Sequence, residues 1–458
     1  MPLLVSVSGI RGVVGNGLTP ELVLRVAQAY GSWLGGGKVI LGRDSRVTGE
    51  MLRGAVISGL MAVGCDVVDL GICPTPTTEI ATERHGDGGI IITASHNPIE
   101  WNALKLLAPD GLFLDEEQGA EVMRRMDAGD FRYAKWDGVG KLSHFTGAVK
   151  EHVAEILNLR FLDVRGIRRR RFRVVADCVH GAGGVILPYL LDRLGCEAKI
   201  LHEEANGLFP RKPEPLPEHL GELGEAVRAF GADLGLAVDP DVDRLALVDE
   251  SGRPLGEEYT LALATDFVLS KRPGPVVVNA STTRAIDDLA ARYGATVVRT
   301  KVGEIHVAKK AREVGATIAG EGNGGVILPD VHLGRDAPVG LALILQGLLE
   351  KGEPISRWHS SLPQYAMVKD RIEVGSVPAP EIVERYKEKL GPADVDLTDG
   401  VKLLLEDAWV QVRPSNTEPI VRVMAEAPTP ERARRLADEH LAILRDLLSQ
   451  IPKGSTQG

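Results

Sequence analysis

One supersecondary pattern occurs three times along the 458-residue chain, and it limits the fold more than any other feature. Each copy has an apolar strand segment, a polar or glycine-rich turn, a helical segment, a glycine and a second strand segment. The copies begin at Val39, Arg173 and Val276, and we expect their helices over about residues 48–63, 183–194 and 282–293. The glycine suits the left-handed conformation that ends many helices. Because strand–helix–strand units build sheets with helices on both faces, the pattern predicts three similar α/β domains.

The last quarter of the chain has a different pattern. Strand-like segments lie on both sides of residues 413–419, and a helix is expected over about 430–450, where leucines and alanines form one stripe. A chain of this length is too long for one hydrophobic core. We therefore predict α/β domains over residues 1–150, 151–252 and 253–362, followed by a smaller α+β domain over residues 363–458.

Composition and charge exclude some functions and locations. The net charge of −10 argues against a general nucleic-acid-binding protein, because affinity for nucleic acid depends on basic surface. The four cysteines are scattered without a CxxC pair, which is typical of reduced thiols in a cytosolic protein. No signal-peptide pattern is present at the start, and the apolar stretch 338–349 is too short to cross a bilayer. We expect a cytoplasmic protein without nucleic-acid or membrane partners, while the sequence leaves monomer or dimer open.

The run from Thr93 to Pro98 contains the first candidate catalytic residue, Ser95. It follows an apolar strand pattern, so Ser95 is expected at the C-terminal end of a strand, where open α/β sheets bind ligands. Ser95 could simply cap the backbone of a turn. It could form a dyad with His96, although adjacent residues rarely face each other. It could also be phosphorylated, and the added charge of about −1.5 to −2 would require nearby cations.

A second loop carries Asp239, Asp241 and Asp243 between two strand-like segments. Alternating carboxylates on an irregular loop can converge on one hard cation, typically Mg²⁺, and without a cation they would repel one another. The loop is not an EF-hand, because Arg244 stands at the sixth position, where glycine is needed. We expect Arg244 to pair with a carboxylate or phosphate near the metal. A plain acidic turn is the alternative.

A third motif, residues 413–419, has the composition of a phosphate clamp. It combines the guanidinium of Arg413 with the hydroxyls of Ser415 and Thr417 and the amide of Asn416, and Arg422 follows closely. Arginine binds a phosphate dianion through two parallel hydrogen bonds. The alternative is a polar hairpin turn.

Weaker candidates lie elsewhere in the chain. Arg11 lies in a glycine-flanked segment, and Lys105 follows Ser95 by ten residues, so its strand could return to the same pocket. The glycine-rich segment 320–325 contains Glu321 and Asn323, which could bond to neighbouring sugar hydroxyls. This segment does not match the GxGxxG pattern of dinucleotide-binding proteins.

These motifs occur in order, one in each predicted domain, and their combination resembles the α-D-phosphohexomutase family (phosphomannomutase/phosphoglucomutase and phosphoglucosamine mutase). The resemblance implies three similar mixed α/β/α-sandwich domains and a C-terminal α+β domain around a central cleft. It also implies interconversion of hexose 1-phosphate and hexose 6-phosphate through a phosphoserine and a hexose 1,6-bisphosphate, with Mg²⁺ bound. Mannose and glucose phosphates are the favoured substrates. Phosphoglucosamine mutase is the alternative activity, and a serine-dependent phosphatase is a further one.

The resemblance also implies a role for each candidate residue. Ser95 would carry the phosphoryl group and serve as a further metal ligand beside the three aspartates. Arg11, Lys105 and His96 would assist catalysis. The residues that would bind substrate are Arg244, Lys301, Glu321, Asn323, Arg413, Ser415, Asn416, Thr417 and Arg422.

The chain departs from the bacterial pattern Gly-Glu-X-Ser-Gly-His of this family. Asn323 replaces the serine and Gly325 replaces the histidine, which looks more like archaeal-type members. We hypothesise that His332 compensates for the missing histidine, or that Arg11 and Lys105 suffice.

Overall fold

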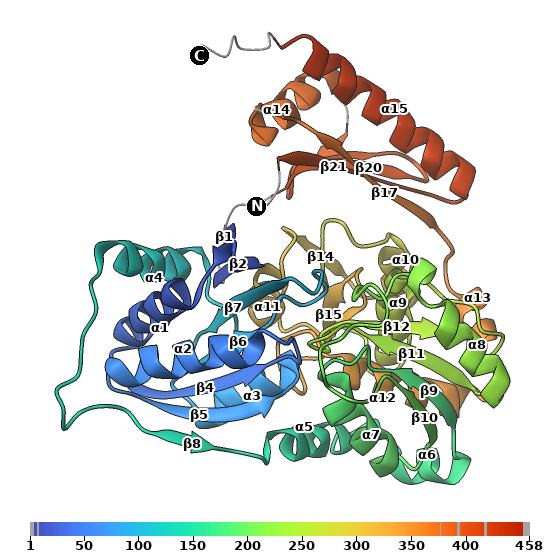
Figure 1. The fold of residues 1–458 in the computed structure, drawn as a ribbon. Helices are drawn as coiled ribbons and strands as arrows, with labels where there is room; N and C mark the ends of the chain where they lie inside the picture. Colours follow the sequence, from blue (N-terminus) through green and yellow to red (C-terminus); the bar gives the residue numbers. More distant parts are fainter. Residues whose placement is uncertain (1–3, 7–8, 376, 392–393, 416–418, 452–458) are drawn as a thin grey trace.

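The computed structural model describes residues 4–6, 9–375, 377–391, 394–415 and 419–451. In this part of the chain, four sheets follow one another along the sequence, and helices cover both faces of the first three (Figure 1). The fourth sheet lies apart from the others, with its helices on the far side (Figure 1). The expected α/β fold with a separate C-terminal domain is therefore confirmed.

The first domain is built on an eight-stranded mixed sheet of order β1-β2-β7-β6-β4-β5-β8, in which β3 pairs with β2. Its strands are β1 (Leu4–Ser6), β2 (Gly9–Val14), β3 (Gly17–Leu18), β4 (Gly37–Arg43), β5 (Cys65–Ile72), β6 (Gly88–Ile92), β7 (Trp101–Leu107) and β8 (Leu142–His144). Its helices are α1 (Pro20–Leu34), α2 (Gly49–Ala62), α3 (Thr75–His85) and α4 (Glu116–Ala128).

The second domain has a four-stranded sheet of order β10-β9-β11-β12. Its strands are β9 (Arg173–Asp177), β10 (Glu197–Leu201), β11 (Leu234–Val238) and β12 (Leu245–Val248). Its helices are α5 (Ala148–Leu157), α6 (Val164–Arg170), α7 (Gly183–Arg193), the short 3₁₀ helix η1 (Pro217–His219) and α8 (Gly221–Phe230).

The third domain has a four-stranded sheet of order β14-β13-β15-β16. Its strands are β13 (Val276–Asn279), β14 (Val297–Thr300), β15 (Ile318–Glu321) and β16 (Gly325–Ile327). Its helices are α9 (Glu257–Lys271), α10 (Ala285–Arg292), α11 (Glu304–Val314), α12 (Ala337–Lys351) and α13 (Ile355–Ser361). Helix α10 begins three residues later than expected, because the Asn279 side chain holds Ser281 and Thr282 in a turn.

The three sheets share one four-strand unit. In β5-β4-β6-β7, β10-β9-β11-β12 and β14-β13-β15-β16, the first three strands are parallel and the last is antiparallel. The antiparallel strand follows the third strand through a short loop. These equivalent loops carry Ser95, the aspartate triad and Asn323, so the repeated topology places three of the sequence motifs at corresponding positions.

The C-terminal domain has a five-stranded sheet of order β17-β21-β20-β19-β18, which is antiparallel throughout. Its strands are β17 (Ala366–Glu373), β18 (Val395–Asp396), β19 (Val401–Leu404), β20 (Trp409–Pro414) and β21 (Ile420–Ala427), and its helices are α14 (Ala379–Leu390) and α15 (Pro430–Ser449). Polar contacts join it to the third domain: Lys369 bonds to Glu257 and Glu258, and buried Lys402 donates to the carbonyl of Ala280 over 2.7 Å.

The second and third domains share one hydrophobic core, whereas the first and the C-terminal domains have cores of their own. Helix α12 lies inside the shared core, and its residues from Ala337 to Leu348 are buried. This burial explains the apolar stretch 338–349. None of the helices in the described residues is both long enough and apolar enough to cross a membrane.

Candidate active site

Ser95 lies just after β6, in the loop that leads to β7, with a backbone φ of +47°. A left-handed conformation costs a non-glycine residue about 1–3 kcal/mol, so surrounding contacts must hold it. The Ser95 amide donates to the Thr93 hydroxyl, and the Ser95 hydroxyl donates to Asp239 Oδ2 over 2.7 Å. The serine of the first domain is therefore bonded directly to the aspartate loop of the second.

Arg46 holds the Ser95 loop in this conformation. Its guanidinium is buried and donates to four backbone carbonyls, those of Ser95, Asn97, Pro98 and Trp101, over 2.6–2.9 Å. Its Nε pairs with Asp44, whose other contacts include the Thr93 hydroxyl. One side chain thus fixes the backbone at the candidate phosphorylation site and in the loop that follows it.

The aspartates of the second loop are fully buried and close together. Ligand oxygens of Asp239, Asp241 and Asp243 lie within 4.8 Å of one another. Val242, between them, has a φ of +66°, which is unusual for a β-branched residue and turns the loop sharply. Burial, together with the charges of Asp243 and Asp241, raises the pKa of Asp239 well above its usual value. Such crowding of carboxylates is typical of a cation site.

The hydrogen bonds of these aspartates leave oxygens available for a cation. Lys105 and the Thr75 hydroxyl both donate to Oδ2 of Asp241, and Arg335 donates to Oδ2 of Asp243. The Oδ1 atoms of Asp241 and Asp243 are buried and have no hydrogen-bond partner. Unpaired buried carboxylate oxygens are costly, so the donor set fits a hard divalent cation such as Mg²⁺.

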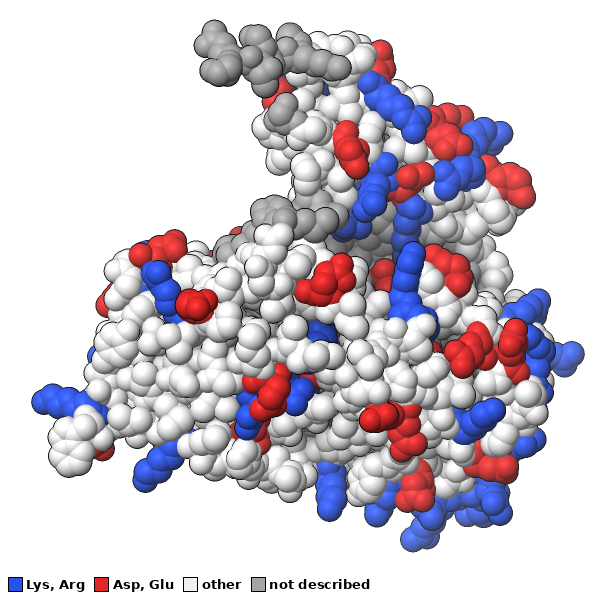
Figure 2. Space-filling model, viewed as in Figure 1, with Lys and Arg blue, Asp and Glu red and all other residues white. Residues whose placement is uncertain are grey.

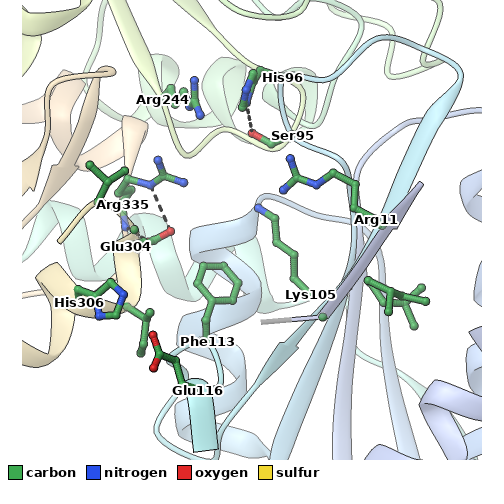
Figure 3. A pocket seen from close by; sticks show the side chains of 17 residues that line it. Arg11, Ser95, His96, Lys105, Phe113, Glu116, Arg244, Glu304, His306 and Arg335 are labelled. Atoms are coloured by element: carbon green, nitrogen blue, oxygen red, sulfur yellow. Dashed lines mark hydrogen bonds and ion pairs between the residues drawn. The ribbon is translucent and has the colours of Figure 1, made fainter. Parts of the chain in front are cut away.

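Cationic side chains surround the hydroxyl of Ser95. In Figure 3, the ends of Arg11 and Lys105 point toward the space beside Ser95, and Arg335 points into it from the opposite side. Arg11 donates to the Asn97 side chain over 2.7 Å. Burial lowers the pKa of Lys105, but Asp241 and Asp243 more than offset this, and the net pKa is raised. Lys105 therefore remains charged at neutral pH.

His96 approaches Ser95 despite being its neighbour in sequence. Nδ1 of His96 lies 3.4 Å from the Ser95 hydroxyl, because the left-handed backbone at Ser95 brings the two side chains to the same side. Burial, together with Arg244 and Arg11, lowers the pKa of His96 well below its usual value. Within the described residues no carboxylate bonds to its ring, so a serine–histidine–acid triad is not formed.

Glu321 is the last residue of β15, and Asn323 lies in the loop between β15 and β16. Glu321 is buried and accepts hydrogen bonds from Asn279 and Arg335, each over 2.8 Å. Asn323 is only partly buried and lines the cleft. Arg244, after the aspartate loop, donates to Glu214 over 2.8 Å, and its Nε lies 3.8 Å from Oδ1 of Asp243.

A row of arginines faces this loop from the C-terminal domain. In the sheet register, Arg422 on β21 is directly opposite Arg413 on β20 and Arg371 on β17. Like charges directly opposite each other are destabilising, so such a row is typical of an anion site. Arg413 lies within β20 and not in a loop, because β20 stays paired with β21 as far as Pro414. The amide of Ser415 donates to the carbonyl of Ile420, while Asn416 and Thr417 lie outside the described residues.

Ser95 with the cationic side chains around it, and the arginines of the C-terminal domain, line two cavities that meet. The serine lobe, with a volume of about 480 Å³, is lined by Arg11, Ser95, Lys105, Glu304 and Arg335 among others. The arginine lobe, with a volume of about 500 Å³, is lined among others by Asn323, Arg371, Arg413 and Arg422. His96, Arg244 and Val302 line both lobes, which makes them parts of one cleft. Figure 2 shows the C-terminal domain overhanging the other three, with lysine and arginine side chains where the two parts meet.

Comparison with known proteins identifies the family. Family models described as phosphoglucomutase/phosphomannomutase match the chain as α/β/α domain I over residues 3–133, domain II over 150–252, domain III over 256–365 and the C-terminal domain over 368–443. The chain therefore belongs to the phosphoglucomutase/phosphomannomutase family.

The similarity to individual members of this phosphohexomutase family extends over nearly the whole chain. A probable phosphoglucosamine mutase of Methanopyrus kandleri is 43% identical over 97% of this chain and 98% of the relative. A phosphoglucomutase/phosphomannomutase of Thermococcus kodakarensis is 42% identical over 96% of this chain and 98% of the relative. The crystal structure of a family protein from Burkholderia thailandensis matches with a TM-score of 0.85 and 28% identity, covering 97% of each chain.

Two sequence candidates lie away from the main cleft of this family member. Lys301 is exposed and lines a smaller cavity with Glu116, Glu117 and Lys309, beside the serine lobe. His332 lines neither lobe. Its Nε2 lies 2.9 Å from Asp336 in a buried cluster, so it is not placed to act where the family histidine would.

Sequence reasoning missed three arginines. They are Arg46, Arg335 and Arg371. Arg335 directly precedes Asp336, the N-cap of α12, and a cap signal there gives no hint of the arginine's contacts. Arg371 is one of the exposed residues that alternate with half-buried ones on β17, which is the pattern of an ordinary strand.

Proposed function

We propose that this chain is a hexose-phosphate mutase that interconverts hexose 1-phosphate and hexose 6-phosphate through a phosphoserine at Ser95 and a hexose 1,6-bisphosphate intermediate. The observation that carries the proposal is the bond from the Ser95 hydroxyl to Asp239, which joins a serine of the cleft to a buried cluster of aspartates that could hold a cation. That cleft continues to the row of arginines on the C-terminal domain. A mutase needs both features, because its bisphosphate intermediate has a phosphate at each end.

The proposed reaction consists of two phosphoryl transfers. In the first, O6 of a bound hexose 1-phosphate attacks the phosphorus on Ser95, so the O6–P bond forms and the P–Oγ bond breaks. The O6 proton leaves to a base, and Oγ becomes a hydroxyl on receiving a proton. The bisphosphate then turns in the cleft, and Oγ attacks the phosphorus on O1. The P–O1 bond breaks, hexose 6-phosphate leaves, and Ser95 is phosphorylated again, so no phosphate is consumed.

The charged residues of the serine lobe suit these transfers. Phosphoryl transfer is catalysed mainly by positioning and by stabilising charge on the transferring group. Asp239, Asp241 and Asp243 would hold Mg²⁺, with the phosphoserine oxygen as a further ligand, and the bound cation would neutralise negative charge on the phosphoryl group. Lys105 and Arg11 would bind its remaining oxygens. His96, neutral because of its lowered pKa, lies 3.4 Å from the Ser95 hydroxyl and would help to orient it.

The arginine lobe would bind the phosphate that is not being transferred. Arg413 and Arg422 would hold it, and Arg371, directly opposite Arg422, would add a third guanidinium. We propose that Ser415, Asn416 and Thr417 complete this clamp. Glu321 and Asn323 would bind the sugar hydroxyls between the two phosphates, Arg244 would face both lobes, and Lys301 would approach from the cleft margin.

Glucose and mannose phosphates are the proposed substrates. Glucosamine phosphate is the second candidate, favoured by the name of the Methanopyrus relative, and Asn323 could bond to either a hydroxyl or an amino group. We further propose that hexose 1,6-bisphosphate acts as activator and that the enzyme works in the cytoplasm.

The test is turnover with Mg²⁺ on mannose, glucose and glucosamine 1-phosphates, each primed with its 1,6-bisphosphate. Ser95→Ala should abolish conversion to the 6-phosphate, whereas Ser143→Ala, at a surface serine of the same domain, should not. Inorganic phosphate as the main product would indicate a phosphatase. Failure of Ser95 to incorporate phosphate would refute the mechanism.

A further inference from the structure

Arg335 connects three segments that contribute to the cleft. Its Nη2 donates to Asp243 Oδ2 over 2.5 Å, its Nη1 to Glu321 Oε2 over 2.8 Å, and its Nε to Glu304 Oε2 over 3.1 Å. The residue is only 8% exposed. Asp243 lies in the loop after β11, Glu321 ends β15, and Glu304 begins α11. One buried guanidinium therefore sets the positions of these carboxylates relative to one another.

The backbone of Arg335 is fixed by its neighbours. Its own amide donates to Glu304 Oε1 over 2.6 Å. The next residue, Asp336, caps α12 and accepts hydrogen bonds from His152 and His332. Because His152 belongs to α5 and α12 lies in the shared core, the arginine is anchored on the rigid part of the molecule.

Gly325 provides the space through which the arginine reaches the cleft. A Cβ atom on Gly325 would lie 2.3 Å from Cδ and 2.9 Å from Cγ of Arg335. Both distances are far below van der Waals contact, so residue 325 and the arginine stem compete for the same volume. Gly325 has no positive φ, so the backbone itself would accept another residue. The requirement for glycine here arises from Arg335.

The chemistry of the contacts requires arginine and not merely a positive charge. A guanidinium presents donors in a rigid planar fork, and here Nε, Nη1 and Nη2 each bond to a different carboxylate. A lysine ammonium is a single point charge and cannot span them. The contact also leaves Oδ1 of Asp243 without a hydrogen bond, so this oxygen can serve as a cation ligand.

We propose that Arg335 is a positioning residue that holds the sugar-binding carboxylate of Glu321 and the cation-binding carboxylate of Asp243 in one fixed arrangement, and that Gly325 is required to accommodate it. This inference rests on the proposed function for its catalytic consequence. It also answers the question raised by the missing loop histidine. The volume next to residue 325 is filled by Arg335, and a histidine there would displace it.

The first experiment separates geometry from charge. Arg335→Lys keeps the charge but loses the planar guanidinium fork, so we expect kcat/KM for the sugar phosphate to fall about 10- to 100-fold. The affinity for Mn²⁺ should fall over a similar range. It is measured by electron paramagnetic resonance on the unphosphorylated protein. Arg272→Lys is the matched control, because Arg272 pairs with Asp330 on the surface of the same domain. A folded Arg335→Lys protein with wild-type values for both quantities would overturn the proposal.

The second experiment tests the competition for space. Gly325→Ala should lower kcat/KM in the wild-type background, because the new methyl group displaces Arg335. In the Arg335→Ala background, where the space is empty, adding Gly325→Ala should change kcat/KM by less than about twofold, as expected when one residue acts through the other. If Gly325→Ala lowered kcat/KM equally in both backgrounds, glycine would not be required at this position to accommodate Arg335.

The two readouts distinguish failure of this inference from failure of the proposed function. If the wild-type protein converts no hexose phosphate but Arg335→Lys still weakens Mn²⁺ binding, the activity is wrong and the positioning of Asp243 stands. If the wild-type protein is an active mutase and Arg335→Lys changes neither readout, the activity stands and the positioning role is wrong.

Discussion

Replacement of Arg46 by methionine tests how the serine loop is held. The substitution keeps most of the side-chain length but removes the four hydrogen bonds to the carbonyls of Ser95, Asn97, Pro98 and Trp101. At a net value of about 1 kcal/mol for each bond, the closed loop loses about 4 kcal/mol relative to its open form. Since 1.4 kcal/mol corresponds to a tenfold change, the opening equilibrium should increase about 700-fold.

Native-state hydrogen exchange measures this opening directly. The amides of Asn97 and Trp101 bond within the loop, to the carbonyls of Ala94 and Pro98, and they should lose protection by about the same 700-fold factor. Amides of helix α15 in the C-terminal domain should keep their protection. We also expect phosphate incorporation at Ser95 to slow, because the left-handed backbone there would no longer be held.

Arg43→Met is the matched control. Arg43 precedes Arg46 by three residues, but it pairs with the exposed Glu50, and such surface pairs contribute at most about 1 kcal/mol. Its effect on exchange should stay below about tenfold. If Arg46→Met left the protection of Asn97 and Trp101 unchanged, or changed it no more than Arg43→Met, the view that Arg46 holds the loop would be refuted.

Lys402, Arg413 and Asp241 each give a further testable outcome. Burial lowers the pKa of Lys402 to about 7, and the charge of Arg299 adds to this effect. Between pH 7 and 10.5 the folded state therefore binds fewer protons than the unfolded state. The free energy of unfolding should rise over this range by up to about 1.4 kcal/mol per pH unit. Lys402→Met should remove this rise in thermal unfolding of the C-terminal domain, and an unaltered pH profile would contradict the assignment. Arg413→Ala should raise KM about 10- to 100-fold without preventing phosphorylation of Ser95, and unchanged KM would refute the phosphate clamp. Asp241→Asn should abolish Mn²⁺ binding seen by electron paramagnetic resonance, and retention of wild-type affinity would exclude the cation site.

The architecture was largely predictable because its signals are local and repeated. The helices α2, α7 and α15 lie within a residue or two of their predicted ranges. Apolar periodicity and a glycine at the C-terminal end of a helix are signals that depend only on residues close together in the chain. The three motif loops were also found in sequence, because Ser95, the alternating aspartates and the glycines around Glu321 each form a dense local pattern. Their expected arrangement at strand ends follows from the general behaviour of parallel sheets.

The contacts of the site were much less predictable. Arg46 and Arg335 are isolated arginines in irregular segments, and nothing near them in sequence indicates which carbonyls or carboxylates they bind. Arg371 became visible only through the strand register, which places it opposite Arg422. The hypothesis for His332 rested on its closeness in sequence to the segment with Glu321 and Asn323, but the fold directs this side chain to Asp336.

The sequence by itself determined the number and type of domains and the chemistry of each loop, because these depend on residues that are close together in the chain. Only the tertiary structure decided which loops meet. The bond from Ser95 to Asp239 spans 144 positions, and that from Arg335 to Asp243 spans 92. Such contacts depend on how whole domains pack around the shared core that contains α12. The surfaces that pack are assembled from segments far apart in the chain, so no local sequence pattern predicts them.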